Sequence, residues 1–397
     1  MLSVEKAFDN IIGSAKPLTT ERLGVEKTSG RILAAPIAAR RSQPGCAISA
    51  MDGYAVRSVD LDGKMQCFEV IGESAAGKPF QGVVVAGQTV RIFTGAAVPE
   101  GADQVIIQEN TDLREGNMYS RETPTSQKNI RAAGIDFADK QCVLDAGTFL
   151  TPKAIGLAAS AGHSHLMVHR APKVAILSTG DELVAPDQKH FQPFETVNST
   201  APQIMALLSS AGAECSFLGQ AKDDLPSLRK YIKAAANADI LITIGGASVG
   251  DKDLIQKALS DENMELGFWK VAMRPGKPLI SGQIGKTKVL GLPGNPVSAF
   301  VCALLFARPL VDKLMGRPAP LPTGVPLPLA ASMPQNGSRQ HYVRARLIGH
   351  PGERRVDPAV DQDSSLLSVL AQSDGLIIRA PDCPASSAGD LVPFLPF

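Results

Sequence analysis

The feature that most constrains this fold is the alternation of short apolar strands with helices over residues 173–315. Five segments have the composition of strands, and they are Val174–Leu177, Cys215–Leu218, Ile240–Ile244, Phe268–Val271 and Val289–Gly291. Most are apolar on both faces, as strands of a parallel sheet covered by helices must be. The segment is therefore predicted to form an open α/β domain, whose ligands bind at the carboxyl ends of the strands.

The remaining sequence predicts three further parts around this domain. At 397 residues the chain exceeds one core, because single cores stop growing at about 250–300 residues. Short alternating runs between Gly and Pro turns predict an inserted all-β domain at 46–136. Segments 1–45 and 137–168 are predicted to form a linker domain, and 317–397 a small C-terminal β-barrel or sandwich. The α/β domain then occupies 169–316.

Composition argues against several classes of protein. A net charge of +1 gives no basic field for nucleic acid, and the six cysteines form no C-x-x-C pair that would indicate a disulfide framework or a zinc site. The N-terminus does not resemble a signal peptide, and no apolar run approaches the roughly 18 residues of a membrane span. We expect a cytoplasmic protein with neither a nucleic-acid nor a membrane partner.

Two rigid turns rich in proline and glycine are predicted at one edge of the α/β sheet. They are Arg274–Pro278 and, after one predicted strand, Gly291–Ser298. Proline fixes φ and glycine permits close approach, so both turns should hold a fixed backbone. The cations Arg274 and Lys277 beside such turns favour an oxyanion site, although structural turns with solvated basic residues explain this pattern equally well when it is taken alone.

Acidic residues follow the other predicted strands of the same domain. Glu182, Asp223 and Asp253 come after the first, second and third strands. Carboxylates beside Arg274 and Lys277 are typical of a phosphate held together with Mg²⁺, because hard cations take carboxylate and phosphate oxygens together. The combination predicts a functional site more strongly than either set of charges does.

Several acidic residues in these loops also have an ordinary structural interpretation. Asp251 or Asp253 could cap the helix that starts at Leu254, and Asp224 could cap the helix that starts at Leu225. The loop Gly245–Gly250, which contains Ser248, suits an anion held by N–H groups. It is neither G-x-G-x-x-G nor a P-loop, which weakens a generic nucleotide-fold interpretation.

Taken together, the motifs resemble the molybdopterin molybdenumtransferases, the MoeA and gephyrin E-domain family. The resemblance spans nearly the whole chain and rests on six motifs in the family's order, at residues 50–57, 92–99, 178–183, 245–250, 274–278 and 291–298. It implies a subunit with a linker domain, an inserted β domain, an α/β domain like the molybdopterin adenylyltransferases and a C-terminal β domain. It also implies an elongated homodimer.

The resemblance implies a specific transferase reaction in molybdenum cofactor biosynthesis. Molybdate is inserted into the dithiolene of adenylylated molybdopterin, and Mg²⁺-dependent cleavage of the adenylate releases AMP. The adenylyltransferase of the preceding step and apo-molybdoenzymes are the implied partners. Two alternatives are a non-catalytic scaffold of this fold, against which the retained acidic residues argue, and the adenylyltransferase itself, which resembles only the α/β part.

The resemblance also assigns roles to single residues. Catalytic positions are Asp52, Thr94, Glu182, Asp223 and Asp253, of which the last three are also the metal ligands. Asp52 and Thr94 lie in turns that local physics makes ordinary, yet in this family they reach into the partner subunit's cleft, so the site lies at the subunit interface. The implied binding positions for substrate are Gly245, Gly246, Ser248, Gly250, Arg274, Lys277, Pro293, Asn295, Pro296 and Ser298, with Arg344 and Ser368 from the C-terminal domain completing the pocket.

Three positions depart from the family's usual pattern. Ile244 replaces a serine, Arg274 replaces a lysine, and the segment Gly134–Asp136 lacks one carboxylate. The second change keeps the charge but exchanges a point ammonium for a forked guanidinium. These departures leave the choice between molybdate and tungstate open.

Overall fold

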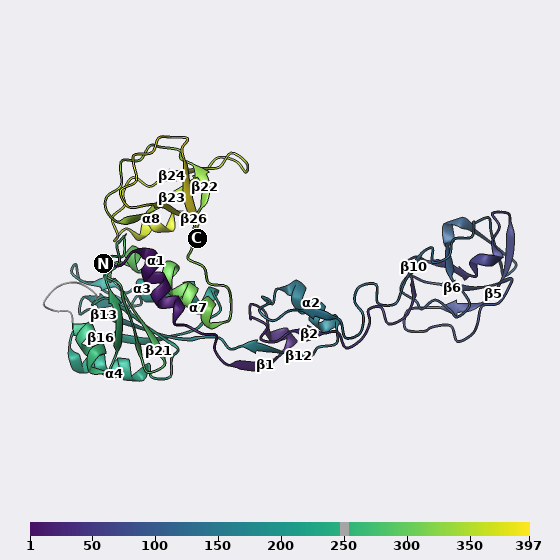
Figure 1. Ribbon diagram of the computed structural model, residues 1–397, viewed down its shortest axis with the longest axis horizontal. Helices are drawn as coiled ribbons and strands as arrows, with labels where there is room; N and C mark the ends of the chain where they lie inside the picture. The colour runs from purple at the N-terminus through teal and green to yellow at the C-terminus, as the bar shows by residue number, and fades with distance from the viewer. Residues whose placement is uncertain (247–253) are drawn as a thin grey trace. The chain divides into compact units, whose positions relative to one another are not determined.

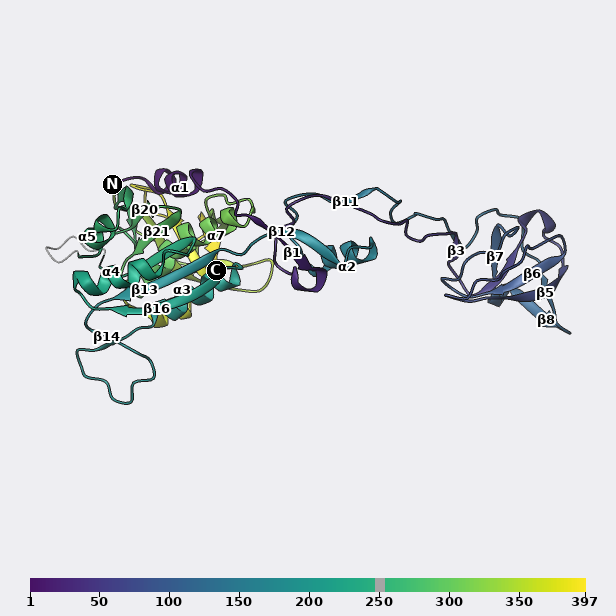
Figure 2. The ribbon, with the colours of Figure 1, turned by 90° about the horizontal axis from the view of Figure 1, so that it is seen from below.

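The computed structural model describes residues 1–246 and 254–397, and Figures 1 and 2 show the chain from two sides. The chain divides into two compact units, one of Met1–Glu21 with His169–Phe397 and one of Arg22–Val168. The predicted four-part division remains a prediction. It assigns residues 1–21 to the linker domain, whereas these residues group with the first unit, where helix α1 (Val4–Gly13) packs against α7 (Arg308–Leu314).

A six-stranded sheet forms the centre of the α/β domain. Its order is β16, β13, β17, β21, β20, β18, with bounds Glu214–Ala221, Lys173–Thr179, Ile240–Ile244, Thr287–Leu292, Ile280–Ile284 and Glu265–Trp269. The first four strands are parallel. All five residues of β17 are buried, as a strand covered on both faces requires, so the α/β prediction is confirmed.

The prediction of one strand between the two proline-glycine turns is wrong. The structure has the hairpin β20–β21 there, and β20 is antiparallel to both β21 and β18. The sequence of β20 carries a central glycine, Gly282, which weakens its strand pattern. Because two antiparallel pairings restore the direction, β18 runs parallel to β21, and the segments that follow these two strands leave the same edge of the sheet.

Helices cover both faces of this sheet. In Figure 1, α4 (Leu225–Ala234) lies on one side and α1 and α3 (Thr200–Ser210) lie on the other. On the α4 side, which also carries α5 (Leu254–Asp261), the core includes Leu177 and Leu241. A continuous helical segment follows β21 and consists of α6 (Pro296–Cys302), a π-helical stretch (Ala303–Ala307) and α7.

The C-terminal domain is a second sheet, which begins in an unexpected place. Its order is β19, β23, β25, β26, β22, and β24 pairs with β23. The bounds are Met273–Arg274, Gln340–Ile348, Gly375–Arg379, Leu391–Pro396, Val325–Pro328 and Arg355–Pro358. The strand β19 belongs to the first proline-glycine turn and places Arg274 opposite His341. This turn therefore joins the α/β sheet to the C-terminal sheet.

The inserted domain in the second unit is all-β, as predicted. Its sheet has the order β7, β4, β6, β5, β9, β8, with bounds Gln104–Ile107, Gly53–Val56, Gln88–Ile92, Gln66–Ser74, Asn117–Ser120 and Thr111–Arg114. The short strand β3 (Ile48–Ser49) pairs with β10 (Ile130–Arg131) and leads into the Asp52 turn. The linker part of this unit contains β2 (Ile37–Ala38), β11 (Cys142–Leu144) and α2 (Pro152–Ser160).

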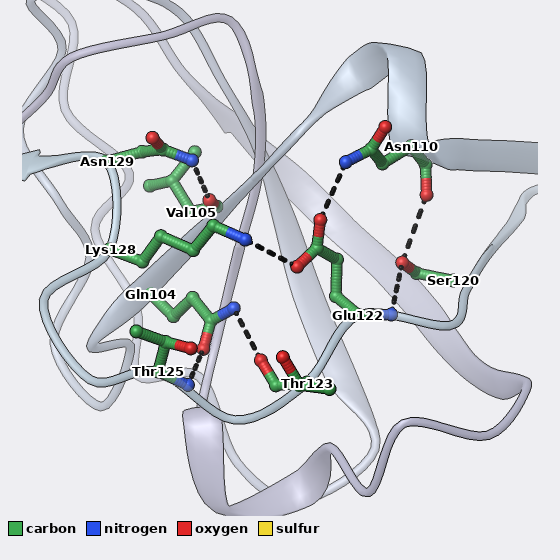
Figure 3. Close-up of polar contacts among 9 residues, drawn as sticks. All are labelled: Gln104, Val105, Asn110, Ser120, Glu122, Thr123, Thr125, Lys128 and Asn129. Atoms are coloured by element: carbon green, nitrogen blue, oxygen red, sulfur yellow. Dashed lines mark hydrogen bonds and ion pairs between the residues drawn. The ribbon is translucent and has the colours of Figure 1, made fainter.

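A network of polar side chains ties the segment 121–131 to the edge strand β7, and Figure 3 shows its contacts. The Lys128 ammonium lies 2.7 Å from the Glu122 carboxylate, which also accepts a hydrogen bond from Asn110 (2.6 Å). Gln104, which is fully buried, donates to the Thr123 carbonyl (3.2 Å). The hydrogen bond from Lys128 is the largest contribution that lowers the pKa of Glu122. We call this set of residues the edge network.

Across the part of the chain that the structure describes, no helix combines the length and the apolar character needed to span a membrane.

Candidate active site

The predicted loops of the α/β domain all leave one edge of the sheet. In the strand register, Ser178 of β13 lies opposite Ile244 of β17, which in turn lies opposite Leu292 of β21. Farther along, Gly291 is aligned through β20 with Trp269 at the end of β18. The chain segments that follow these strands therefore start side by side, as ligand-binding loops of an open α/β sheet do.

Two acidic loops meet at this edge. The Asp223 backbone N–H donates to the Asp181 carboxylate (3.2 Å), which joins the loop after β16 to the loop after β13. Asp181, Glu182 and Asp223 are all exposed. Gly180 has φ +140°, and a Cβ at this position would lie 2.7 Å from a Glu182 carboxylate oxygen. Asp181 was not among the predicted site residues, although it stands beside Glu182 in the same motif.

Of the two helix-capping interpretations, the structure confirms the one at Asp224 and does not test the one before Leu254. Asp224 is the N-cap of α4, where its carboxylate accepts the Ser227 backbone N–H (2.7 Å). Asp253, Ser248 and Gly250 lie outside the described residues. Among the described residues, no three His, Cys, Asp or Glu side chains are grouped as a ready-made metal site. Metal binding by Glu182 and Asp223 thus remains a prediction.

Glycines bring two of the loops into contact. Gly245 and Gly246 have φ values of +96° and +64°, which side-chain-bearing residues rarely adopt. A Cβ on Gly245 would lie 2.6 Å from the Thr179 carbonyl oxygen, and one on Gly294 would lie 3.6 Å from the Gly245 Cα. The Gly245 N–H also donates to the Leu292 carbonyl (3.1 Å). The loop after β17 and the turn after β21 are therefore packed backbone against backbone.

The cations of the first turn point away from the core. Arg274 and Lys277 are both exposed, and within the described residues neither side chain has a hydrogen-bond or ion-pair partner. Between them, Gly276 has φ +104°, and a Cβ there would lie 2.6 Å from the Cys302 sulfur of α6. Glycine thus lets this turn lie directly on α6 while its two charged side chains stay exposed.

The field around Arg274 is strongly positive. Burial lowers the pKa of His341 to about 4, helped by the charges of Arg274, Arg379, Arg339 and Arg344. His341 is therefore neutral at physiological pH, because a further positive charge among these guanidinium groups would be unfavourable. Such a concentration of arginine at the junction of two sheets favours an anionic ligand.

The second turn is held by the C-terminal domain. Asn295 precedes α6, and its side-chain amide donates to the Ser364 hydroxyl (2.8 Å). The Val297 N–H donates to the Ser364 carbonyl (3.2 Å). Pro293 is buried, Pro296 is the first residue of α6, and Ser298 is only 5% exposed. The start of α6 is thus fixed, and Ser298 in its first turn is buried.

The two C-terminal residues predicted to complete the pocket differ sharply in exposure. Arg344 is 1% exposed, and its guanidinium donates to the carbonyls of Leu366 (3.1 Å), Asp363 (2.9 Å) and Asp361 (3.2 Å). Its observed contacts hold the loop at residues 361–366. Ser368 is exposed at the start of α8 (Leu367–Ala371), which packs against α6.

In the second unit, the structure brings Asp52 and Thr94 together. The Thr94 N–H and hydroxyl both donate to one Asp52 carboxylate oxygen at 2.7 Å. These bonds hold the pKa of Asp52 below its ordinary value, so the partly exposed carboxylate is ionised at neutral pH. The buried Ser49 organises both turns, because its hydroxyl donates to the Met51 carbonyl and its carbonyl accepts the Gly95 N–H (2.8 Å).

Comparison with known protein families gives three consecutive matches. The MoeA N-terminal region (domain I and II) matches residues 2–162, a probable molybdopterin binding domain matches 175–313, and the MoeA C-terminal region (domain IV) matches 326–397.

Similar proteins cover the chain from end to end. A molybdopterin molybdenumtransferase from Haemophilus influenzae is 35% identical over 402 residues, which is 100% of this chain and 99% of that protein. One from a Nostoc species is 37% identical over 75% of this chain and 70% of its own length. The crystal structure of a molybdopterin biosynthesis MoeA protein from Pyrococcus horikoshii superposes with a TM-score of 0.85 at 27% identity, covering 100% and 99% of the two chains.

Proposed function

Because this chain belongs to the MoeA family of molybdopterin molybdenumtransferases and acts in molybdenum cofactor biosynthesis, we propose that it inserts molybdate into the dithiolene of adenylylated molybdopterin and releases AMP. One observation carries the proposal. The exposed cations Arg274 and Lys277 leave the same sheet edge as the carboxylates Glu182 and Asp223. This arrangement suits a substrate that is anionic and is handled together with a hard cation.

Arg274 and Lys277 are proposed to bind the tetrahedral molybdate dianion. Charge-assisted hydrogen bonds to an oxyanion are stronger than neutral ones, and the turn that carries these residues is fixed by Gly276 on α6 and by β19 in the C-terminal sheet. Fixed donors need no rearrangement as charge develops in the reaction. The glycines 245 and 246 and the turn from Pro293 to Ser298 would line the same site through their backbones.

Glu182 and Asp223 are proposed to hold Mg²⁺, together with Asp253. Their oxygens are the ligands this ion prefers, and Mg²⁺ commonly takes one or two carboxylates plus waters and substrate phosphates. The described carboxylates, exposed on two adjoining loops, fit that mode without forming a closed metal cage. The bound ion would neutralise charge on the phosphates of the adenylate.

Asp52 and Thr94 are proposed to enter the site from the partner subunit of a homodimer. Support comes from the match to the family motifs and from the Asp52 carboxylate, which is partly exposed and whose pKa is lowered by its two hydrogen bonds from Thr94. One carboxylate oxygen accepts both Thr94 bonds, so the other is available to accept a hydrogen bond from the substrate. The protein is proposed to be cytoplasmic, to receive its substrate from the preceding adenylyltransferase and to deliver the cofactor to apo-molybdoenzymes.

The test uses purified protein with adenylylated molybdopterin, Mg²⁺ and molybdate. We expect molybdate-stimulated release of AMP, measured by chromatography, and a product that activates an apo-molybdoenzyme. Absence of molybdate-stimulated AMP release would refute the proposed reaction. A parallel reaction with tungstate determines whether Arg274, in place of the family's usual lysine, changes the choice of metal.

A further inference from the structure

Arg91 of the inserted β domain is held in a fixed position beside the Asp52 turn. It lies opposite Tyr54 in the β4–β6 register, and its guanidinium carbon is 5.0 Å from the Tyr54 ring centroid and 4.9 Å from that of Phe93. The guanidinium also donates to the Gly53 carbonyl (3.1 Å) and to the Gln108 side-chain oxygen (2.7 Å). Stacking on two rings and two hydrogen bonds fix the orientation of the group.

Arg91 keeps both its charge and part of its donor capacity. A guanidinium has five N–H donors, and two of them are used by the contacts to Gly53 and Gln108. Among the described residues, no carboxylate lies within ion-pair distance of Arg91. Its charge contributes to the lowered pKa of Asp52, but less than the two Thr94 bonds do. The side chain is only partly exposed, so its charge is less screened by water than that of a fully exposed arginine.

We propose that Arg91 binds an anionic phosphate oxygen of the substrate, next to Asp52 and Thr94. This inference rests on the proposed function, which places Asp52 and Thr94 at the bound substrate. Phosphate is the chemical class that the free N–H groups of a fixed guanidinium fork recognise. The inserted β domain then supplies one cation and one carboxylate to the site, whereas the implied family positions in this domain are the acidic and hydroxyl residues Asp52 and Thr94.

The chain offers a matched control for this residue. Arg114 of β8 in the same sheet also lies over an aromatic ring, that of Tyr119, at 5.5 Å. It differs from Arg91 because it pairs with the Asp112 carboxylate (3.3 Å). Replacement of Arg114 by Gln therefore removes a stacked arginine that is already neutralised by its neighbour.

The experiment compares Arg91→Gln, Arg91→Lys and Arg114→Gln in the full-length protein. Steady-state AMP release gives kcat and the KM for adenylylated molybdopterin, and calorimetric titration gives the Kd for AMP. We expect Arg91→Gln to raise both KM and the AMP Kd by about 10- to 100-fold, as loss of a charged hydrogen bond does, with kcat within about threefold of wild type. The KM and the AMP Kd of Arg91→Lys should lie between those of wild type and Arg91→Gln, because lysine keeps the charge but lacks the forked donors of a guanidinium. Arg114→Gln should match wild type.

Other results would contradict the proposal in distinguishable ways. An unchanged KM and AMP Kd, with a lower kcat and a lower unfolding temperature, would mean that Arg91 only supports the Asp52 turn. Weaker binding of molybdate with unchanged binding of AMP would assign Arg91 to the other anion and overturn the phosphate assignment. If Arg91→Gln does not fold, the Arg91→Lys titrations decide between these outcomes.

Failure of this inference differs from failure of the proposed function. If Asp52→Asn abolishes AMP release and Arg91→Gln binds AMP like wild type, the function stands and the inference is wrong. If wild-type protein releases no AMP but binds AMP in an Arg91-dependent way, the function is wrong and Arg91 remains a phosphate-binding residue.

Discussion

The edge network of the inserted domain and the strand-end loops of the α/β domain contain similar charged and polar residues, but in the two regions these residues have different roles. In the edge network, Glu122 accepts hydrogen bonds from both Lys128 and Asn110. The Gln104 amide also uses both of its polar groups, because its nitrogen donates a hydrogen bond and its oxygen accepts one. At the strand ends, Arg274 and Lys277 lack partners among the described residues. Charges matched inside the protein stabilise a fold, whereas unmatched charges on a fixed backbone are available to a ligand.

The same contrast separates two arginines that were assigned to one pocket. Arg344 is buried and donates to three backbone carbonyls, while Arg274 is exposed and faces solvent. The sequence gives no sign of this difference, because both are single arginines next to apolar residues. We call a charge satisfied when it has a partner within the described residues and open when it has none there. Four predictions test whether satisfied charges serve stability and open charges serve ligand binding.

The largest effect is expected from Arg274→Gln. This change removes an open cation, so molybdate-stimulated AMP release should fall by about two to three orders of magnitude, while the unfolding temperature stays near that of wild type. Lys286→Gln is the control, because Lys286 is an exposed cation in the β20–β21 turn at the opposite edge of the sheet. A large loss of stability in Arg274→Gln would show that this cation is structural after all.

Arg344→Leu should give the reverse result. Loss of the guanidinium leaves the carbonyls of Asp361, Asp363 and Leu366 without their donor, so we expect the free energy of unfolding to fall by about 3 kcal/mol. Urea denaturation measures this change. If Arg344→Leu were as stable as wild type but had a raised KM for the substrate, Arg344 would be a ligand-binding residue.

The neutral His341 predicts a dependence of stability on pH. Its pKa in the folded state is about 4, below the unfolded value near 6.5, so the unfolded chain binds the proton more readily. The stabilisation is fully present above about pH 6.5 and is lost as the pH falls toward 4, with a total on the order of 3 kcal/mol.

The His341 prediction is checked by urea denaturation between pH 7.5 and 4.5. A His341→Gln variant should lose less stability than wild type over this interval, and His350→Gln, at an exposed position, should behave like wild type. Parallel curves for wild type and His341→Gln would show that the histidine is not held neutral by its surroundings.

The smallest effect is expected in the edge network. Glu122→Gln keeps an acceptor for Asn110 but removes the negative charge that faces Lys128. Because the Lys128 side chain is 38% exposed, the cost in unfolding free energy should be about 1 kcal/mol. A double-mutant cycle with Lys128→Met measures the coupling, and AMP release should not change. A loss of turnover would mean that the edge network also positions the Asp52 turn, to which it is connected through the paired strands β10 and β3.

The sequence predicted much of the fold because apolar periodicity reports burial directly. The buried strand β17, the all-β inserted domain and the start of α4 at Asp224 all follow local rules of patterning and capping. It missed β20, whose central Gly282 breaks the strand pattern, and it did not indicate that β19 joins the C-terminal sheet. Pairing partners lie far apart along the chain, and no local pattern specifies them.

The sequence by itself determined the family, the kinds of chemical groups available and the rigid turns that carry them, because motif order, proline and glycine act through local backbone geometry. Only the tertiary structure decided which charges are open. It buried Arg344 under a loop, left Arg274 exposed, joined Asp52 to Thr94 and stacked Arg91 on two rings. Whether a charge is satisfied depends on neighbours that packing brings from distant parts of the chain, and packing is a property of the folded whole.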